Sequence, residues 1–211
     1  MNTLLKNQCQ IFQVNEDIEM YLSIDLDYWN HQGGIKSLKR VISAVKDSGK
    51  LRQICDNHKY LLKSIKASGQ DHIINIDTHS DIVDLSSLEY WKKEWDGKKS
   101  RGLNCGTWAN FIPRKLRNVY EWYYPDGFGL RCDWKKDEKD SIFNFPYLIG
   151  FNFMNMKKQS RFPMHLIDDA SDIGISISYY YLDELLSVEK VQSVLKHIFG
   201  RKIPQREFDC Y

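Results

Sequence analysis

Two short apolar runs that end in acidic residues constrain the fold of this chain most. Tyr21–Asp27 (YLSIDLD) and His72–Asp77 (HIINID) each predict a strand that is buried on both faces. Between them, Ile35–Ser48 and His58–Ser68 carry apolar residues at helical spacing, and a glycine follows each segment. Strands of this kind alternating with helices predict an α/β fold, in which a mostly parallel sheet is flanked by helices in three layers.

The rest of the chain continues this pattern less regularly. Asp172–Tyr181 predicts a third strand and Asp183–Phe199 a closing helix, whereas Lys50–Cys55 is ambiguous. The stretch from Tyr90 to Lys158 is interpreted as insertions and loops around the sheet. Because 211 residues suit one core and no linker or repeat interrupts them, we expect a single domain over residues 1–211.

Composition excludes several classes of protein. A formal net charge of +2 argues against nucleic-acid binding as the main function. No segment has the apolar length of a membrane span or the apolar core of a signal peptide, so we expect a cytoplasmic protein without a membrane partner. The five cysteines form no C-x-x-C pair, which favours reduced thiols over a disulfide framework or a zinc knuckle.

Acidic residues and histidines follow both central strands. Asp25 and Asp27 end the first, and Asp77, His79 and Asp81 follow the second. Ligands of an open α/β sheet bind at the carboxyl ends of its strands, where alternate residues point the same way. Carboxylates this close repel one another unless a cation lies between them, so the pattern predicts a site for a divalent metal such as manganese or magnesium. The alternative is a pair of surface turns in which the aspartates cap helices.

These motifs resemble a known superfamily. D-T-H-S-D at 77–81 resembles the D-x-H-x-D signature of the arginase/ureohydrolase superfamily, and S-I-D-L-D at 23–27 resembles its D-x-D signature. Together with I-C-D-N-H at 54–58, they are most similar to a branch of small arginase-like proteins whose characterised members are peptide arginases. The resemblance covers about residues 21–111, and the strand expected at 174–182 is a further candidate for it. Ordinary arginases place the D-x-D after the D-x-H-x-D, so it implies an arginase-like domain with a permuted strand order.

The resemblance also implies a set of metal ligands and two Mn²⁺ ions, although other divalent metals fit the same donors. Asp77 would bridge the ions, His79 would bind one and Asp81 the other. Asp25 would be the second bridging carboxylate. The full implied ligand set is Asp25, Asp27, His58, Asp77, His79 and Asp81. For His58 an ordinary histidine at a helix start remains an alternative. The further histidine of ordinary arginases has no counterpart, and Cys105 lies in that region.

The implied reaction is hydrolysis of an arginine side chain in a ribosomally made precursor peptide, giving ornithine and urea. Asp81 and His79 are the catalytic candidates, with Asp81 moving a proton to the leaving amine. Glu121, Asp126 and Asp172 are weak candidates for holding the guanidinium group, and solvated surface acids are the alternative. Aromatic residues in the ranges 90–101 and 120–124 are candidates for a peptide groove. For Trp91 and Trp95, whose spacing is that of one helix face, a buried face is the alternative.

Other functions remain open from the sequence. A small-molecule ureohydrolase acting on free arginine or agmatine would use the same metal ligands, as would a non-catalytic binding module stabilised by metal. A metallophosphoesterase is disfavoured, since its G-D-x-x-D and G-N-H-[DE] signatures are absent. The sequence leaves the oligomeric state open, and a homo-oligomer is compatible with it.

Overall fold

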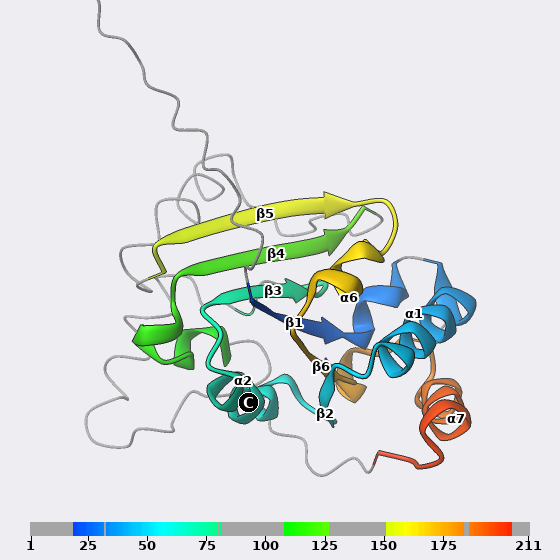
Figure 1. Ribbon diagram of the computed structural model, residues 1–211. Coiled ribbons are helices and arrows are strands. Elements are labelled where there is room, and N and C mark those ends of the chain that lie inside the picture. The colour runs from blue at the N-terminus through cyan, green and yellow to red at the C-terminus, as the bar shows by residue number, and fades with distance from the viewer. Residues whose placement is uncertain are drawn as a thin grey trace, which may run out of the picture.

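One parallel sheet forms the centre of the molecule. The computed structural model describes residues 19–31, 33–79, 81, 108–126, 151–183 and 186–203. Within these residues, six strands lie in the order β2-β6-β1-β3-β4-β5, and every neighbouring pair is parallel (Figure 1). The strands are β1 (Met20–Asp25), β2 (Leu51–Cys55), β3 (His72–Ile76), β4 (Val119–Pro125), β5 (Phe153–Gln159) and β6 (Asp172–Ser176).

Helices cover both faces of this sheet. On one face, α1 (Gly34–Ser48), α6 (His165–Asp169) and α7 (Val188–Phe199) pack into one apolar cluster. On the other face, α2 (Leu61–Ser68) packs into a second cluster with the 3-10 turns η3 (Trp108–Phe111) and η4 (Arg114–Leu116). The predicted three-layer α/β fold is therefore confirmed. None of the helices in the described part of the chain is both long and apolar enough to cross a membrane.

Side-chain alternation in the central strands separates the two apolar clusters and places a polar stripe beneath α2. Tyr21 in β1 and Ile73 in β3 pack in the α2 cluster. Residues two positions apart in a strand point to the same face, so Ser23 and Asn75 also face α2. They are partners across the β1–β3 ladder, and Asp25 continues the stripe at the end of β1. Polar atoms are therefore aligned toward the carboxyl edge of an otherwise apolar sheet.

The termini of several elements differ from those predicted. The first strand ends at Asp25, because the chain turns there into the 3-10 turn η1 (Leu26–Asn30), with the Asp25 side chain accepting the backbone N–H of Asp27. The last strand ends at Ser176, and the turn η5 (Tyr179–Tyr181) follows it. The closing helix begins at Val188, later than predicted.

The interpretation of residues 90–158 as insertions and loops is wrong where the structure describes them. Both β4 and β5 belong to the sheet. Tyr120, Trp122 and Tyr124 are buried in the α2 cluster, so they do not line a peptide groove. The aromatic residues of the range 90–101 lie outside the described residues.

Close packing between β1 and β6 depends on a glycine. The Tyr21 side chain crosses β6 at Gly174, where an added Cβ would lie 2.2 Å from the tyrosine hydroxyl and 2.9 Å from Leu61 Cδ2. Real Cβ atoms do not approach so closely, so only glycine fits here without a shift of its neighbours. This contact helps to fix the register between β1, which carries Asp25, and β6, which carries Ser176.

Candidate metal centre

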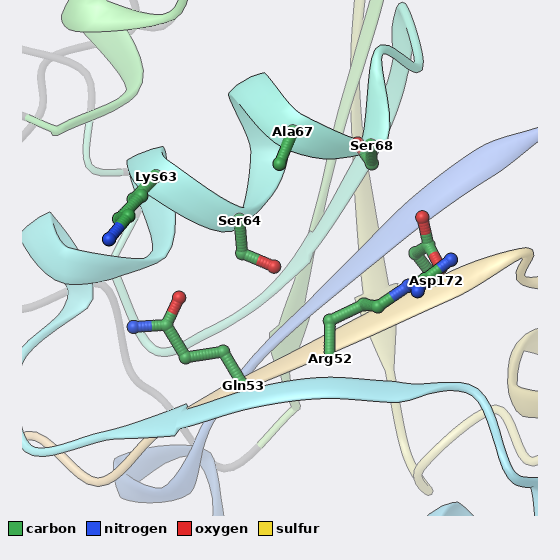
Figure 2. A pocket seen from close by; sticks show the side chains of 7 residues that line it. All are labelled: Arg52, Gln53, Lys63, Ser64, Ala67, Ser68 and Asp172. Atoms are coloured by element: carbon green, nitrogen blue, oxygen red, sulfur yellow. The ribbon is translucent and has the colours of Figure 1, made fainter.

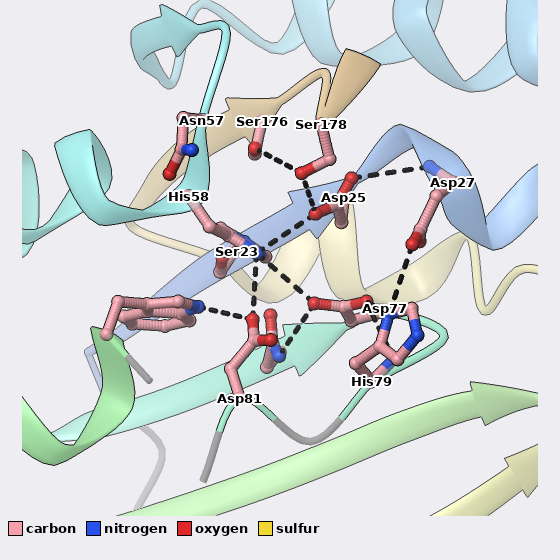
Figure 3. Close-up of polar contacts among 12 residues, drawn as sticks. Ser23, Asp25, Asp27, Asn57, His58, Asp77, His79, Asp81, Ser176 and Ser178 are labelled. Atoms are coloured by element: carbon pink, nitrogen blue, oxygen red, sulfur yellow. Dashed lines mark hydrogen bonds and ion pairs between the residues drawn. The ribbon is translucent and has the colours of Figure 1, made fainter. Parts of the chain in front are cut away.

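Four aspartates and two histidines meet at the carboxyl edge of the sheet (Figure 3). Asp25 is the last residue of β1, and Asp77 directly follows the neighbouring strand β3. Asp27 lies in η1. His58 begins the short turn η2 (His58–Tyr60), which follows β2. Because the strands are parallel, their carboxyl ends share one edge, and residues far apart in the sequence come into contact there.

The first group of possible ligands surrounds His58. Its Nδ1 atom lies 3.1 Å from Asp25 Oδ2, 3.2 Å from Asp77 Oδ2 and 2.9 Å from Asp81 Oδ2. This buried nitrogen has no hydrogen-bond partner of acceptable geometry. When two ligand atoms each lie about 2.1 Å from one ion and their bonds to it form a right angle, the two atoms are about 3 Å apart. The distances around His58 Nδ1 therefore fit atoms that bind the same metal ion.

A second group contains Asp27, Asp77 and His79. His79 Nδ1 lies 3.2 Å from Asp27 Oδ2 and 3.8 Å from Asp77 Oδ1. Asp77 thus directs Oδ2 to the first group and Oδ1 to the second. In each of the trios Asp25–His58–Asp77 and Asp27–Asp77–His79, the ligand atoms lie within 4.8 Å of one another. A carboxylate that serves two groups in this way is suited to bridge two ions.

The cluster is buried except on one side. Asp25, Asp27, His58, Asp77 and Asp81 are all buried. The His79 side chain is 45% exposed and contacts the Tyr181 ring, with the ring centroids 5.1 Å apart. Among the described residues of the cluster, His79 is therefore the one that solvent or a substrate reaches first.

Ionisation of this cluster is strongly perturbed when no cation is present. Burial, with repulsion from Asp77, raises the pKa of Asp25, and burial, with repulsion from Asp25, raises the pKa of Asp27 to about 8. Burial alone would lower the pKa of His79, but its contacts with Asp27 and Asp77 raise it to about 11. Burial would raise the pKa of Asp77, but contacts with His58 and His79 lower it. Without a cation, the buried negative charge of the cluster therefore needs protons on the other aspartates and on the histidines. A divalent cation removes this need, and the mixed carboxylate and imidazole donors suit manganese.

Several groups around the ligands were not predicted from the sequence. Ser23 Oγ lies 2.8 Å from His58 Nε2 and so orients the other ring nitrogen toward the carboxylates. Ser178 donates to Asp25 Oδ2, and Trp108 donates its indole N–H to Asp81 Oδ2. Trp122 donates to the main-chain oxygen of Asp77 at 2.9 Å. These contacts hold the aspartates in place from the segment after β6, from η3 and from β4.

A sequence signal existed for only part of this surrounding shell. Ser23 and Asn75 are polar residues inside apolar strands, each two positions before an aspartate, so the period of a strand places them on the ligand side. Ser178 and Trp108 come from distant segments, and no local pattern marks them. Asp81 and Ser178 have positive φ angles of 55° and 48°, which is rare outside glycine and is often found at functional sites.

The three weak candidates for guanidinium binding lie outside the cluster. Glu121 contacts His72 and Lys157 in the middle of the sheet. Asp126 follows β4 at the same edge as the cluster, but it is half exposed and pairs with Lys158 at 2.5 Å.

Asp172 begins β6 and therefore lies at the opposite edge of the sheet. It pairs there with Arg52 beside a cavity of about 440 Å³ (Figure 2). The Gln70 side-chain amide also lies 3.4 Å from its carboxylate. A carboxylate in this position does not reach the ligands of the metal centre.

Comparisons with protein-family models, with curated proteins and with solved structures gave no match. The assignment of a metal centre therefore rests on the chain itself. It depends on a buried His58 nitrogen that faces three carboxylates without a well-aligned hydrogen bond to any of them, and on Asp77, which serves two groups of donors.

Proposed function

We propose that this chain is a hydrolase with two divalent metal ions, preferably manganese, which converts arginine side chains of a peptide to ornithine and releases urea. The observation that carries the proposal is the position of Asp77, whose two oxygens face two separate groups of donors. Sites of this kind support hydrolysis because two neighbouring ions activate one water molecule.

Charge supports a pair of ions rather than one. With both histidines neutral, Asp25, Asp27, Asp77 and Asp81 together carry four negative charges, which two divalent ions would balance. One ion would leave two buried carboxylate charges without compensation, at a substantial cost in free energy.

Hydrolysis of a guanidinium group makes specific demands on the site. Guanidinium stays protonated at physiological pH and is stabilised by resonance, so water at neutral pH does not attack it at a useful rate. Two divalent ions, when bound, lower the pKa of the water between them. The peptide side chain loses its terminal carbon and two nitrogens as urea, and the ornithine amine keeps the remaining nitrogen.

The residues of the chain have separate parts in this proposal. Asp81 takes the proton of the attacking water and passes it to the leaving amine, a role that suits a carboxylate 2.9 Å from the His58 nitrogen at the centre of the first group. The Trp108 indole holds Asp81 Oδ2 and leaves Oδ1 for that proton. His79, the exposed member of the cluster, lies where the substrate would enter.

The experiment that tests the proposal combines metal analysis with product analysis. The purified protein is assayed for bound manganese and then incubated with an arginine-containing peptide and, separately, with free arginine. We expect about two ions per chain, urea release, and loss of CH2N2 from the peptide. Turnover of free arginine alone would instead indicate a small-molecule ureohydrolase. Bound metal without urea from either substrate would indicate a metal-stabilised binding module.

A matched pair of variants separates the site from general damage to the fold. Asp77→Asn removes the shared carboxylate and should abolish metal retention and turnover together. Asp172→Asn changes the same residue type, equally buried on the same sheet, but at the opposite edge. It should keep both metal and turnover. Full activity in Asp77→Asn would refute the assignment.

A further inference from the structure

A second cavity lies at the same edge of the sheet as the metal centre. It has a volume of about 310 Å³, and its wall includes Tyr28 and Trp29, the two residues that directly follow Asp27 in η1. The opposite wall is the segment between β5 and α6, from Ser160 to Met164. The beginning of α1 closes a third side. The turn η1 connects β1 to α1 at the carboxyl edge of the sheet (Figure 1), so the residues that line the cavity lie near the edge at which a substrate of the metal centre would bind.

This cavity carries uncompensated positive charge. Arg40 from α1 and Arg161 from the segment after β5 both line it, and both are exposed. Neither forms an ion pair with any acid among the residues that the structure describes. Two guanidinium groups on separate segments at one cavity form a fork for a carboxylate, which they can bind in bidentate fashion.

The remaining wall is a packed aromatic base, in which Trp29 and Phe162 are both buried. Trp29 and Phe162 are stacked, with ring centroids 5.4 Å apart and planes inclined by 18°. Ser37 Oγ accepts the Trp29 indole N–H at 3.1 Å, which leaves the serine proton free to donate. Gly33 lines the same end, where an added Cβ would lie 2.8 Å from Ser37 Cβ, so glycine keeps this end open.

We infer that this cavity binds a carboxylate of the peptide substrate, carried by an acidic residue near the target arginine. The inference rests on the proposed function, according to which a peptide binds at this carboxyl edge of the sheet. The metal centre recognises the cationic side chain, and the Arg40–Arg161 cavity recognises the anionic one. The chain would therefore select arginines by a neighbouring Asp or Glu in the peptide.

The test compares synthetic peptides that differ in one group. Each contains one arginine and has a blocked C-terminus, and the pair differs only in a Glu or a Gln at a fixed spacing from the arginine. Several spacings are measured. A third peptide has the Gln and a free C-terminal carboxylate, to distinguish a side-chain carboxylate from a terminal one. For the manganese-loaded enzyme we expect a KM about tenfold lower for the best Glu peptide than for its Gln partner.

Charge variants show whether the cavity causes this preference. In the double variant Arg40→Gln and Arg161→Gln, the ratio of the two KM values should fall to about one. The control Lys39→Gln and Lys46→Gln removes two charges from the same helix outside the cavity lining, and it should keep the preference. Equal KM values at every spacing in the unaltered enzyme, or a preference that survives the arginine substitutions, would overturn the inference. A preference only for the free C-terminus would overturn the side-chain assignment.

Binding measured without turnover separates this inference from the proposed function. The same peptides, with ornithine in place of arginine, are labelled and titrated against the manganese-loaded protein by fluorescence anisotropy. Tighter binding of the Glu peptide, lost in the arginine variant, supports the cavity even if no urea is ever detected. Urea release with no difference in binding between the Glu and Gln peptides would leave the proposed function standing and reject the cavity.

Discussion

At the scale of single residues, the members of the acidic cluster were predictable, whereas most of the side chains that contact them were not. The aspartates and histidines stand in short motifs after apolar strands, where sequence pattern alone marks them. The extended D-x-D geometry was not observed, because Asp27 lies in η1, yet its carboxylate still reaches His79. Ser178 contacts Asp25 across 153 positions of sequence, and no local pattern encodes such a contact.

A prediction at this scale concerns Ser23, which contacts the ring nitrogen of His58 that faces away from the carboxylates. Ser23→Ala should weaken manganese binding by about 10- to 100-fold, since partners of a ligand histidine fix its orientation and basicity. Calorimetric titration with manganese measures the change. Ser43→Ala in α1 is the control and should bind metal like the unaltered protein. Unchanged affinity in Ser23→Ala would show that His58 is not oriented through this contact.

Gly174 gives a second prediction, which concerns packing. Gly174→Ala should lower the free energy of unfolding by about 1–3 kcal/mol, because the new methyl group would overlap the Tyr21 hydroxyl. In a Tyr21→Phe background that closest atom is absent, so the same substitution should cost less. Urea denaturation of the four proteins of this double-mutant cycle measures the coupling. If the two substitutions lower the free energy of unfolding additively, the close contact between Gly174 and the Tyr21 hydroxyl would be contradicted.

At the scale of elements, strands buried on both faces were predicted well and the outer strands poorly. β1 and β3 are short apolar runs flanked by turns and glycines, which is a strong signal. β5 is an edge strand without a fully buried residue, and the apolar face of its sequence FMNMKKQ consists only of Met154 and Met156. β4 alternates aromatic residues, as a strand would, but its tyrosines and tryptophan also suit a binding surface. The sequence of β4 therefore does not distinguish a buried strand from a binding surface. The position of β4 between β3 and β5 in the sheet does.

The pairing of β4 with β5 gives a prediction on pH. Burial would raise the pKa of Glu121, but contacts with His72 and Lys157 outweigh it and lower the pKa to about 2. A carboxyl group with a lowered pKa stabilises the fold above its unfolded pKa, near 4.5, and this contribution disappears as the pH falls toward 2. Lys157 is 38% exposed, so solvent screening limits the effect to about 1–2 kcal/mol.

Urea denaturation at several pH values tests this directly. The unaltered protein should be more stable than Glu121→Gln at pH 6, and the two should converge as the pH approaches 2. Asp126→Asn removes an exposed ion pair and serves as the control, with a difference within about 0.5 kcal/mol throughout. A difference for Glu121→Gln that does not change with pH would indicate that the carboxylate charge does not stabilise the sheet.

At the scale of the whole molecule, the candidate metal centre joins segments that come from separate strands and turns. Its ligands come from β1, η1, η2 and the residues after β3. At a free manganese concentration 100 times the dissociation constant, metal binding should stabilise the folded chain by about 2.7 kcal/mol. This corresponds to an increase in Tm of about 5–10 °C. Thermal unfolding with manganese and with a chelator measures this shift. Asp77→Asn should show no manganese-dependent shift, whereas Asp172→Asn should show the full one.

The strand order also determines when the centre is complete during synthesis. β1 is made first, but it lies between β3 and β6, and β6 begins only at Asp172. Until Ser178 has left the ribosome, Asp25 lacks the hydroxyl group that fixes its carboxylate. A nascent chain that stops before this point carries most of the ligands in an incomplete sheet. The acidic cluster is therefore complete only after all the strands around β1 and the segment that follows β6 have been made.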